Sequence, residues 1–252
     1  MGRGVKRLAP VVLMKNELAF TTRSFTIDTY LGEPQNLVRI FSELDAHEIV
    51  VINLGDLNSE MMKILEAMSK GSYVPLHFAG GINSASDAAL VVGLGFEKIG
   101  LELRSLDLDL PKIQSIAERV GSTSTSASIS VVCNNLGDYI LWDWKSGTRS
   151  SIGLQEAVNA LNGSGCGELK VNSVDRDGSG LGPDIKLASQ VREFTDLPLV
   201  YQGGVKTQAD VDFLWSLGID CVATGTMLST YGPHKAALAH YPLSDEMELR
   251  WR

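Results

Sequence analysis

The sequence predicts an α/β protein of the (β/α)8 TIM barrel class, built from two (β/α)4 half-barrels. Short apolar runs alternate with amphipathic stretches along all 252 residues, and a segment of the first half matches one of the second half without a gap. Strands that alternate with helices predict right-handed βαβ units and a parallel sheet. Eight such units in about 250 residues are the usual size of this barrel. We therefore expect residues 1–252 to form a single barrel domain.

Each expected strand is a short apolar run, as is typical of parallel strands buried on both faces. The eight runs are residues 8–14, 48–53, 74–80, 97–103, 128–134, 167–173, 197–203 and 220–225. Helical periodicity fills the intervals between them. The helical stretches lie near residues 35–45, 59–70, 84–94, 109–119, 152–162, 184–194 and 207–217.

The internal match joins residues 74–100 to residues 197–223. A repeat of half the chain describes two half-barrels, whereas a doubly wound sheet has no need of one. The chance pairing of two strand–Gly-Gly–helix units is a weak alternative, because five identities share one offset of 123 positions. These identities are Pro75–Pro198, Gly80–Gly203, Gly81–Gly204, Asp87–Asp210 and Gly95–Gly218.

Composition excludes several classes of function. The net charge of −8 argues against a general nucleic-acid surface. The four histidines show no metal-ligand spacing, so we expect neither a metal nor another cofactor. The N-terminal residues resemble neither a signal peptide nor a membrane span, so we expect a cytoplasmic protein without a membrane partner.

Small residues follow the third, seventh and eighth expected strands. Glycines let a backbone approach a ligand closely, and a following helix offers free N–H groups to an anion. Placed symmetrically at the C-terminal face of a barrel, two Gly-Gly loops predict a substrate with phosphates at both ends. The expected phosphate-binding residues here are Gly80, Gly81, Gly203, Gly204, Gly225 and Thr226.

The stretch "VNSVDRDGSG", residues 171–180, ends the sixth expected strand with three charged and three small residues. Considered alone, it is typical of a solvated loop. At the C-terminal end of a barrel strand, next to a Gly-Gly loop, it favours a functional loop instead. Asp177 and Asp175 are then candidate catalytic residues, and Gly178 is a candidate phosphate-binding residue.

The half-barrel repeat, the two Gly-Gly loops and "SVDRDGSG" together resemble the cyclase subunit of imidazole glycerol phosphate synthase (HisF) and, more distantly, its sister isomerase HisA. The resemblance covers nearly the whole chain and implies a (β/α)8 barrel. It also implies ammonia from a glutaminase partner, which passes through the barrel to a phosphorylated small-molecule substrate. The family reaction gives imidazole glycerol phosphate in histidine biosynthesis.

Two catalytic positions depart from that family. It has aspartates at the ends of its first and fifth strands, where this chain has Leu13 and Asn134. Leucine carries no proton, and an amide is neither acid nor base near neutral pH. Glu102 and Leu103 replace the phosphate donors after the fourth strand, so we expect the first-half phosphate site to be the weaker one. The resemblance thus implies a divergent paralogue with an impaired cyclase reaction.

A further constellation follows the family pattern. The family closes the N-terminal mouth of its barrel with alternating charges that gate ammonia entry. The matching residues are Arg7, Glu48, Lys98 and Glu168. Glu97 falls where the family pairs with its glutaminase. Singly, each charge is typical of a solvated strand end, but four correct signs on four strands favour a gate.

Three functions are compatible with the sequence. We favour a HisF-like synthase subunit of a glutamine amidotransferase that passes ammonia to a phosphorylated or sugar-type acceptor, as in surface-polysaccharide sugar amidination. The first alternative is an authentic cyclase (lyase) of histidine biosynthesis. The second is a non-catalytic phosphate-binding barrel, which leaves the alternating charges unexplained.

Overall fold

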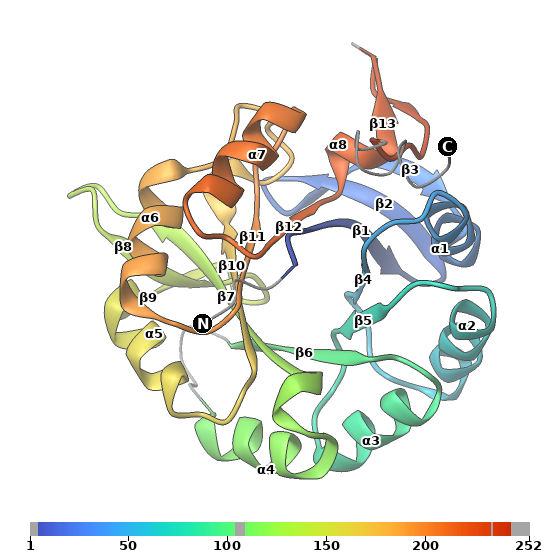
Figure 1. The fold of residues 1–252 in the computed structure, drawn as a ribbon, viewed down its shortest axis with the longest axis horizontal. Coiled ribbons are helices and arrows are strands. Elements are labelled where there is room, and N and C mark those ends of the chain that lie inside the picture. The colour runs from blue at the N-terminus through green and yellow to red at the C-terminus, as the bar shows by residue number, and fades with distance from the viewer. Residues whose placement is uncertain (1–4, 104–108, 233, 243–252) are drawn as a thin grey trace.

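The computed structural model describes residues 5–103, 109–232 and 234–242. Eight parallel strands close into a barrel, which confirms the predicted fold class (Figure 1). The barrel strands are β1 (Arg7–Lys15), β4 (Ile49–Asn53), β5 (Leu76–Ala79), β6 (Lys98–Leu103), β7 (Thr125–Cys133), β10 (Glu168–Ser173), β11 (Leu199–Gln202) and β12 (Cys221–Thr224). Each overlaps one expected strand.

Helices surround the barrel (Figure 1). Their apolar side chains pack against the strands. They are α1 (Pro34–Glu43), α2 (Ser59–Lys70), α3 (Ala85–Gly93), α4 (Leu110–Val120), α5 (Leu154–Asn162), α6 (Ile185–Phe194), α7 (Gln208–Ser216) and the short α8 (Thr226–Ser229). A small ribbon of β13 (Thr230–Tyr231) and β14 (Ala236–Ala237) follows α8. No helix among the described residues has the length and apolar character that crossing a membrane requires.

The half-chain repeat has a structural cause at the start of α3 and α7. The Ser84 hydroxyl accepts a hydrogen bond from the backbone of Asp87, whose carboxylate accepts one from the backbone of Ser84. Thr207 and Asp210 form the same capping box at α7. Because a capping box satisfies two otherwise free N–H groups, each aspartate stabilises the start of its helix.

The Gly-Gly loops also share one packing constraint. A Cβ on Gly80 would lie 1.9 Å from the carbonyl oxygen of Asn53, at the end of the neighbouring strand. A Cβ on Gly203 would lie 2.6 Å from the carbonyl oxygen of Ser173. Both glycines have positive φ, +100° and +118°. Close backbone packing therefore requires these glycines whether or not a phosphate binds beside them.

Two antiparallel hairpins were not expected from the sequence. One follows the first strand of each half-barrel, at the C-terminal face. Their tips meet across that face, where Phe25 and Trp142 contact edge to face with ring centroids 4.8 Å apart. The hairpin strands are β2 (Leu18–Arg23) and β3 (Thr26–Gly32), then β8 (Tyr139–Asp143) and β9 (Thr148–Gly153).

The barrel interior has an apolar wall and a polar wall. The apolar wall is formed by β1, β4, β11 and β12, with Ala9, Val11, Val50, Val200, Cys221 and Ala223. On the opposite side, residues in register on β6, β7 and β10 share the inward face. They are Glu102, Ser126, Ser128, Ser130, Lys170 and Asn172.

Candidate functional site

The C-terminal ends of the strands surround a hollow between β1, β11, β12 and the loop after β10. This hollow brings together the phosphate-binding candidates of the second half-barrel and Asp177. Leu13 on β1, one of the two substituted catalytic positions, lies beside them. The lining includes Leu13, Asp177, Gly178, Gly203, Gly204, Gly225 and Thr226.

Asp177 faces this hollow and also holds the β2–β3 hairpin. Its Oδ2 accepts hydrogen bonds from the Thr22 hydroxyl and the Phe25 backbone N–H, both 2.9 Å long. Burial raises the pKa of the Asp177 carboxyl above its ordinary value, against the effect of these two hydrogen bonds. A Cβ on Gly178 would lie 1.8 Å from the Thr22 carbonyl oxygen. The hairpin therefore requires Gly178, independently of any phosphate.

We expect Asp177→Ala to loosen this hairpin by about 1–3 kcal/mol, because it leaves the Phe25 N–H without its buried acceptor. Ser24 and Phe25 at the turn have positive φ values of 49° and 61°, a conformation that needs support from its surroundings. Limited proteolysis should cut the variant faster near residues 22–26. Asp138→Ala, an exposed aspartate on the same face, serves as the control. Equal cleavage rates for the two variants would contradict the prediction.

The second candidate acid lies apart from the hollow. Asp175 accepts a 2.7 Å hydrogen bond from the Cys133 backbone and so ties the loop after β10 to the end of β7. It is absent from the residues that line the hollow. The contact with Cys133 explains the aspartate at position 175 structurally. Asp177 is therefore the better placed of the two candidate catalytic residues.

Asn134 directly follows β7 but does not face the barrel interior. Its Oδ1 accepts hydrogen bonds from the backbones of Leu136 and Asp138, both 2.9 Å long, and so builds the β7–β8 turn. The inward position near this end of β7 is Ser130, whose hydroxyl donates to Glu102 Oε1 at 2.7 Å. A carboxylate is therefore present at this mouth, on β6 instead of β7.

A second hollow lies at the first-half Gly-Gly loop. Gly80, Gly81 and Glu102 line it, as the sequence predicts. Lys112 on α4 and Lys145 after β8 line it as well. Sequence reasoning missed these lysines, because only the fold brings them next to a glycine loop so far away in the chain. Asp56 lines the hollow too, so two lysines face two carboxylates there.

The four charges at the opposite mouth form one closed ring of ion pairs. Arg7 pairs with Oε2 of both Glu48 and Glu168. Lys98 Nζ lies 2.9 Å from Glu48 Oε2 and 3.0 Å from Glu168 Oε2. Burial disfavours the charge on Glu48, yet His77, Lys98 and Arg7 together hold the pKa of its carboxyl below its ordinary value. Glu48 is thus ionised at neutral pH.

Glu97, the candidate partner contact, has a counterpart in the second half-barrel. Its Oε2 accepts a 2.7 Å hydrogen bond from the Leu76 backbone at the start of β5. Asp220, 123 positions later, accepts one of 2.9 Å from the Leu199 backbone at the start of β11. The repeated contact accounts for Glu97 structurally, so its presence alone is a weak indication of a partner.

The barrel interior carries side-chain atoms without hydrogen-bond partners. Of the eight buried atoms of this kind in the described residues, six lie in the barrel interior. An unsatisfied buried polar atom costs ~1–3 kcal/mol, so such atoms favour small polar guests. From the charged ring toward the C-terminal mouth they are Glu48 Oε1, Glu168 Oε1, His77 Nε2, Ser126 Oγ, Ser128 Oγ and Asn172 Oδ1.

Lys170 is a fully buried amine in the polar wall. Its Nζ donates a long, 3.4 Å hydrogen bond to Gln202 Oε1, a residue that lines the first hollow. Burial lowers the pKa of Lys170, against the attraction of Glu102 and Glu168. A buried amine with one weak partner costs stability.

We expect Lys170→Met to raise the free energy of unfolding by about 1–3 kcal/mol, because methionine fills a similar volume without a polar group to desolvate. Denaturant unfolding measures the change. Lys63→Met, on the exposed face of α2, is the matched control and should change stability by less than ~0.5 kcal/mol. A destabilised Lys170→Met would mean that the attraction of Glu102 outweighs the cost of burial.

Comparison with known proteins agrees with this architecture. Residues 7–232 match the histidine biosynthesis protein family. A Pseudomonas aeruginosa protein, provisionally named imidazole glycerol phosphate synthase subunit hisF2, is 30% identical over 97% of this chain and 98% of its own length. A provisionally named HisF of Leptospira borgpetersenii is 29% identical over 96% and 97%. The imidazole glycerol phosphate synthase subunit HisF of Exiguobacterium sp. is 25% identical over 79% and 78%. The chain therefore belongs to the histidine biosynthesis protein family, as a HisF-like member.

Proposed function

We propose that this protein is the synthase subunit of a glutamine amidotransferase, which receives ammonia at the N-terminal mouth of its barrel and delivers it to an acceptor at the C-terminal mouth. One observation carries the proposal. The closed ring of Arg7, Glu48, Lys98 and Glu168 leads directly into a wall of unpartnered polar atoms. A barrel mouth closed by ion pairs and followed by a polar interior suits a small neutral molecule that moves along the barrel axis.

The acceptor is a phosphorylated or sugar-type molecule, as in the amidination of a surface-polysaccharide sugar. Two hollows with glycine loops flank the exit. The alternative acceptor is the histidine precursor, which the names of the relatives favour and the leucine at position 13 disfavours. A non-catalytic barrel would leave the charged ring without a purpose.

A glutaminase is the proposed source of ammonia, and it docks on the face that carries the ring. Two exposed hydrophobic side chains lie on this face, Val5 before β1 and Tyr73 before β5, at 81% and 89% exposure. Tyrosine is frequent among residues that dominate binding energy at interfaces. Val5 and Tyr73, more than Glu97, are therefore the proposed anchors.

The experiment is co-purification with a glutaminase encoded nearby, followed by assays of glutamine hydrolysis with and without the barrel. Tyr73→Ser should weaken the complex about tenfold or more. Tyr231→Ser is the matched control, because Tyr231 is 67% exposed beyond the opposite mouth. If no glutaminase binds the unmodified barrel, the proposed function is wrong. If both variants bind equally, only the docking face is wrong.

The first-half hollow is proposed to bind a phosphate group through Lys112 and Lys145. Trp144 lines the same hollow, so its fluorescence reports binding of inorganic phosphate. Lys112→Ala combined with Lys145→Ala should weaken binding about tenfold, since each partly exposed charge contributes ~0–1 kcal/mol. Lys63→Ala should bind as the unmodified protein does. Unchanged affinity in the double variant would remove this hollow as a phosphate site.

A further inference from the structure

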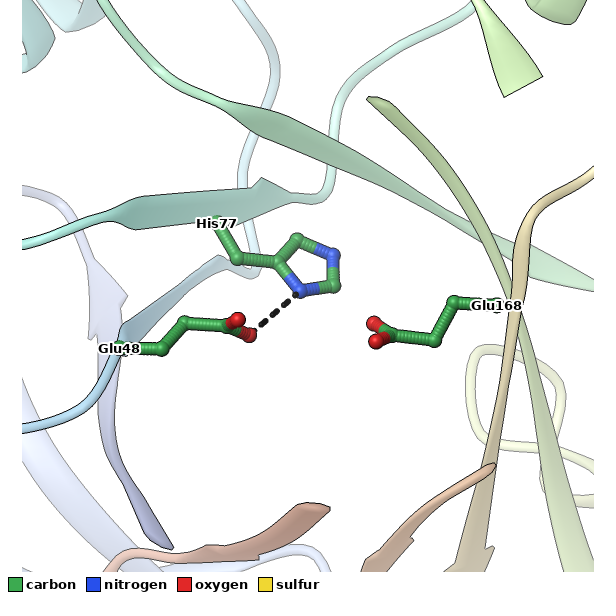
Figure 2. Close-up of side chains that lie close together, drawn as sticks. All are labelled: Glu48, His77 and Glu168. Atoms are coloured by element: carbon green, nitrogen blue, oxygen red, sulfur yellow. Dashed lines mark ion pairs between the residues drawn. The ribbon is translucent and has the colours of Figure 1, made fainter. Parts of the chain in front are cut away.

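Lys170 lies in the middle of β10 and carries a primary amine into the barrel. Glu168, two positions earlier on this strand, points into the barrel toward Glu48 and His77, as Figure 2 shows. Since alternate residues of a strand share one face, Lys170 and then Asn172 follow Glu168 on the inward side, in the direction of the C-terminal mouth. The amine therefore lies between the charged ring and the hollows of the candidate site.

The amine lies near two carboxylates without being paired to either. Glu168 is already engaged by Arg7 and Lys98. In the part of the chain that the structure describes, neither Glu168 nor Glu102 forms an ion pair with Lys170. Burial therefore outweighs their attraction and lowers the pKa of the Lys170 amine. A larger share of this amine is neutral at a given pH than of an exposed lysine, and the neutral form has the lone pair that a nucleophile needs.

The surroundings of the amine combine an apolar side with unsatisfied polar atoms. Val200, in register with Lys170 on β11, belongs to the apolar wall. Ser128, in register on β7, and Asn172 each have a buried side-chain oxygen without a hydrogen-bond partner. Both residues are more than nine-tenths buried, at 2% and 7% exposure. These oxygens are available to hydrogen-bond the hydroxyl groups of a guest beside the amine.

Gln202 connects the amine to the first hollow. The hydrogen bond from Lys170 Nζ to Gln202 Oε1 is 3.4 Å, which is long for such a bond, so the flexible lysine side chain is weakly held. Gln202 lines the hollow beside Gly203 and Gly204. A ligand with its phosphate at this glycine loop can thus bring a neighbouring carbon within reach of Nζ.

We propose that Lys170 Nζ is a nucleophile that forms an imine with the carbonyl carbon of an open-chain sugar phosphate bound at the C-terminal mouth. The nitrogen lone pair forms a bond to the carbonyl carbon, the oxygen takes up both amine protons and leaves as water, and a carbon–nitrogen double bond remains. The step consumes no oxidant, reductant or further reactant. A protonated imine attracts electrons more strongly than the carbonyl group it replaces, so the ligand carbon is activated for further addition.

The ligand class, a phosphorylated sugar, rests on the proposed function, whereas the covalent step belongs to the barrel alone. The test therefore treats the isolated barrel with dihydroxyacetone phosphate and sodium cyanoborohydride, which reduces an imine to a stable amine. Peptide mass spectrometry then locates the label. Lys170 should be labelled saturably and at least ~10-fold faster than the exposed Lys63, because each unit by which burial lowers a pKa raises the neutral fraction about tenfold.

Two internal comparisons sharpen the test. Lys98, which is ion-paired at the opposite mouth and has a raised pKa, should remain unlabelled. Dihydroxyacetone without its phosphate should need an about tenfold higher concentration, since it lacks the charged group that the glycine loop holds. Lys170→Met fills a similar volume without an amine. This variant should stay folded by circular dichroism and lose the label.

Four outcomes overturn the proposal. They are labelling of Lys170 no faster than that of Lys63, equal labelling by dihydroxyacetone and its phosphate, a label on Lys112 or Lys145 alone, and a label that persists in Lys170→Met. Because no glutaminase is present, failed labelling leaves the proposed subunit function standing. A glutaminase that fails to bind equally leaves the labelling result unchanged.

Discussion

Given the ribulosyl aminoimidazole precursor and ammonium salts, the protein should form imidazole glycerol phosphate at least ~10²-fold more slowly than a HisF with aspartates at both catalytic positions. A positioned general acid or base contributes ~10²–10⁴-fold to a rate. Leu13 lines the first hollow and carries no proton. Neither Asn134, in its turn, nor Ser130, at the inward position, supplies a carboxylate at the other position.

The carboxylates that remain are already committed to hydrogen bonds. Asp177 holds the hairpin through Thr22 and Phe25, and Glu102 accepts from Ser130. The assay compares imidazole glycerol phosphate formation at saturating ammonium salt, with the aspartate-bearing enzyme as the reference. Leu13→Asp tests whether an acid at the lining position raises the rate. Turnover of the unmodified protein at the reference rate would show that Asp177 or Glu102 performs the proton transfers.

The barrel was predictable because its signals are local. Apolar runs and helical periodicity indicate which face of each element is buried. The match at one fixed offset indicates the duplicated half-barrel. The structure also shows what parts of that match mean. The Asp87–Asp210 identity marks two helix caps, and Gly80–Gly203 marks two close backbone contacts. A repeated residue therefore indicated repeated packing more reliably than a repeated ligand site.

The parts that sequence reasoning missed depend on the register between distant strands. His77 reaches Glu48 and Glu168 because β5, β4 and β10 all present inward residues at one level of the barrel. Lys112 and Lys145 reach a glycine loop from a helix and a hairpin far along the chain. No spacing of residues along the sequence indicates that these side chains lie close together in the fold. The two hairpins were also missed. They follow expected strands and leave the order of the barrel strands unchanged, so the alternation of strands and helices does not reveal them.

Replacing Lys98 with alanine should lower the free energy of unfolding by about 3 kcal/mol at pH 7, because removal of one partner leaves buried charges uncompensated. Lys98 contacts both glutamates of the ring, and their side chains are only 4% and 5% exposed. Arg7 alone then faces two carboxylates. Denaturant unfolding at pH 7 measures the loss. Lys63→Ala, which removes an exposed pair with Glu60 on α2, should cost less than ~1 kcal/mol.

The pH dependence separates this ring from a solvated cluster. Because the folded protein lowers the pKa of Glu48 below its ordinary value of 4.5, ionised pairing stabilises the fold above that pH. The contribution is lost as the pH falls toward the folded pKa, since the carboxyl then binds a proton. The difference between Lys98→Ala and the unmodified protein should therefore be largest near pH 7 and shrink in acid. A difference in the free energy of unfolding below ~1 kcal/mol at pH 7 is typical of exposed ion pairs. Such a result would mean that water reaches the ring and that this mouth of the barrel stands open.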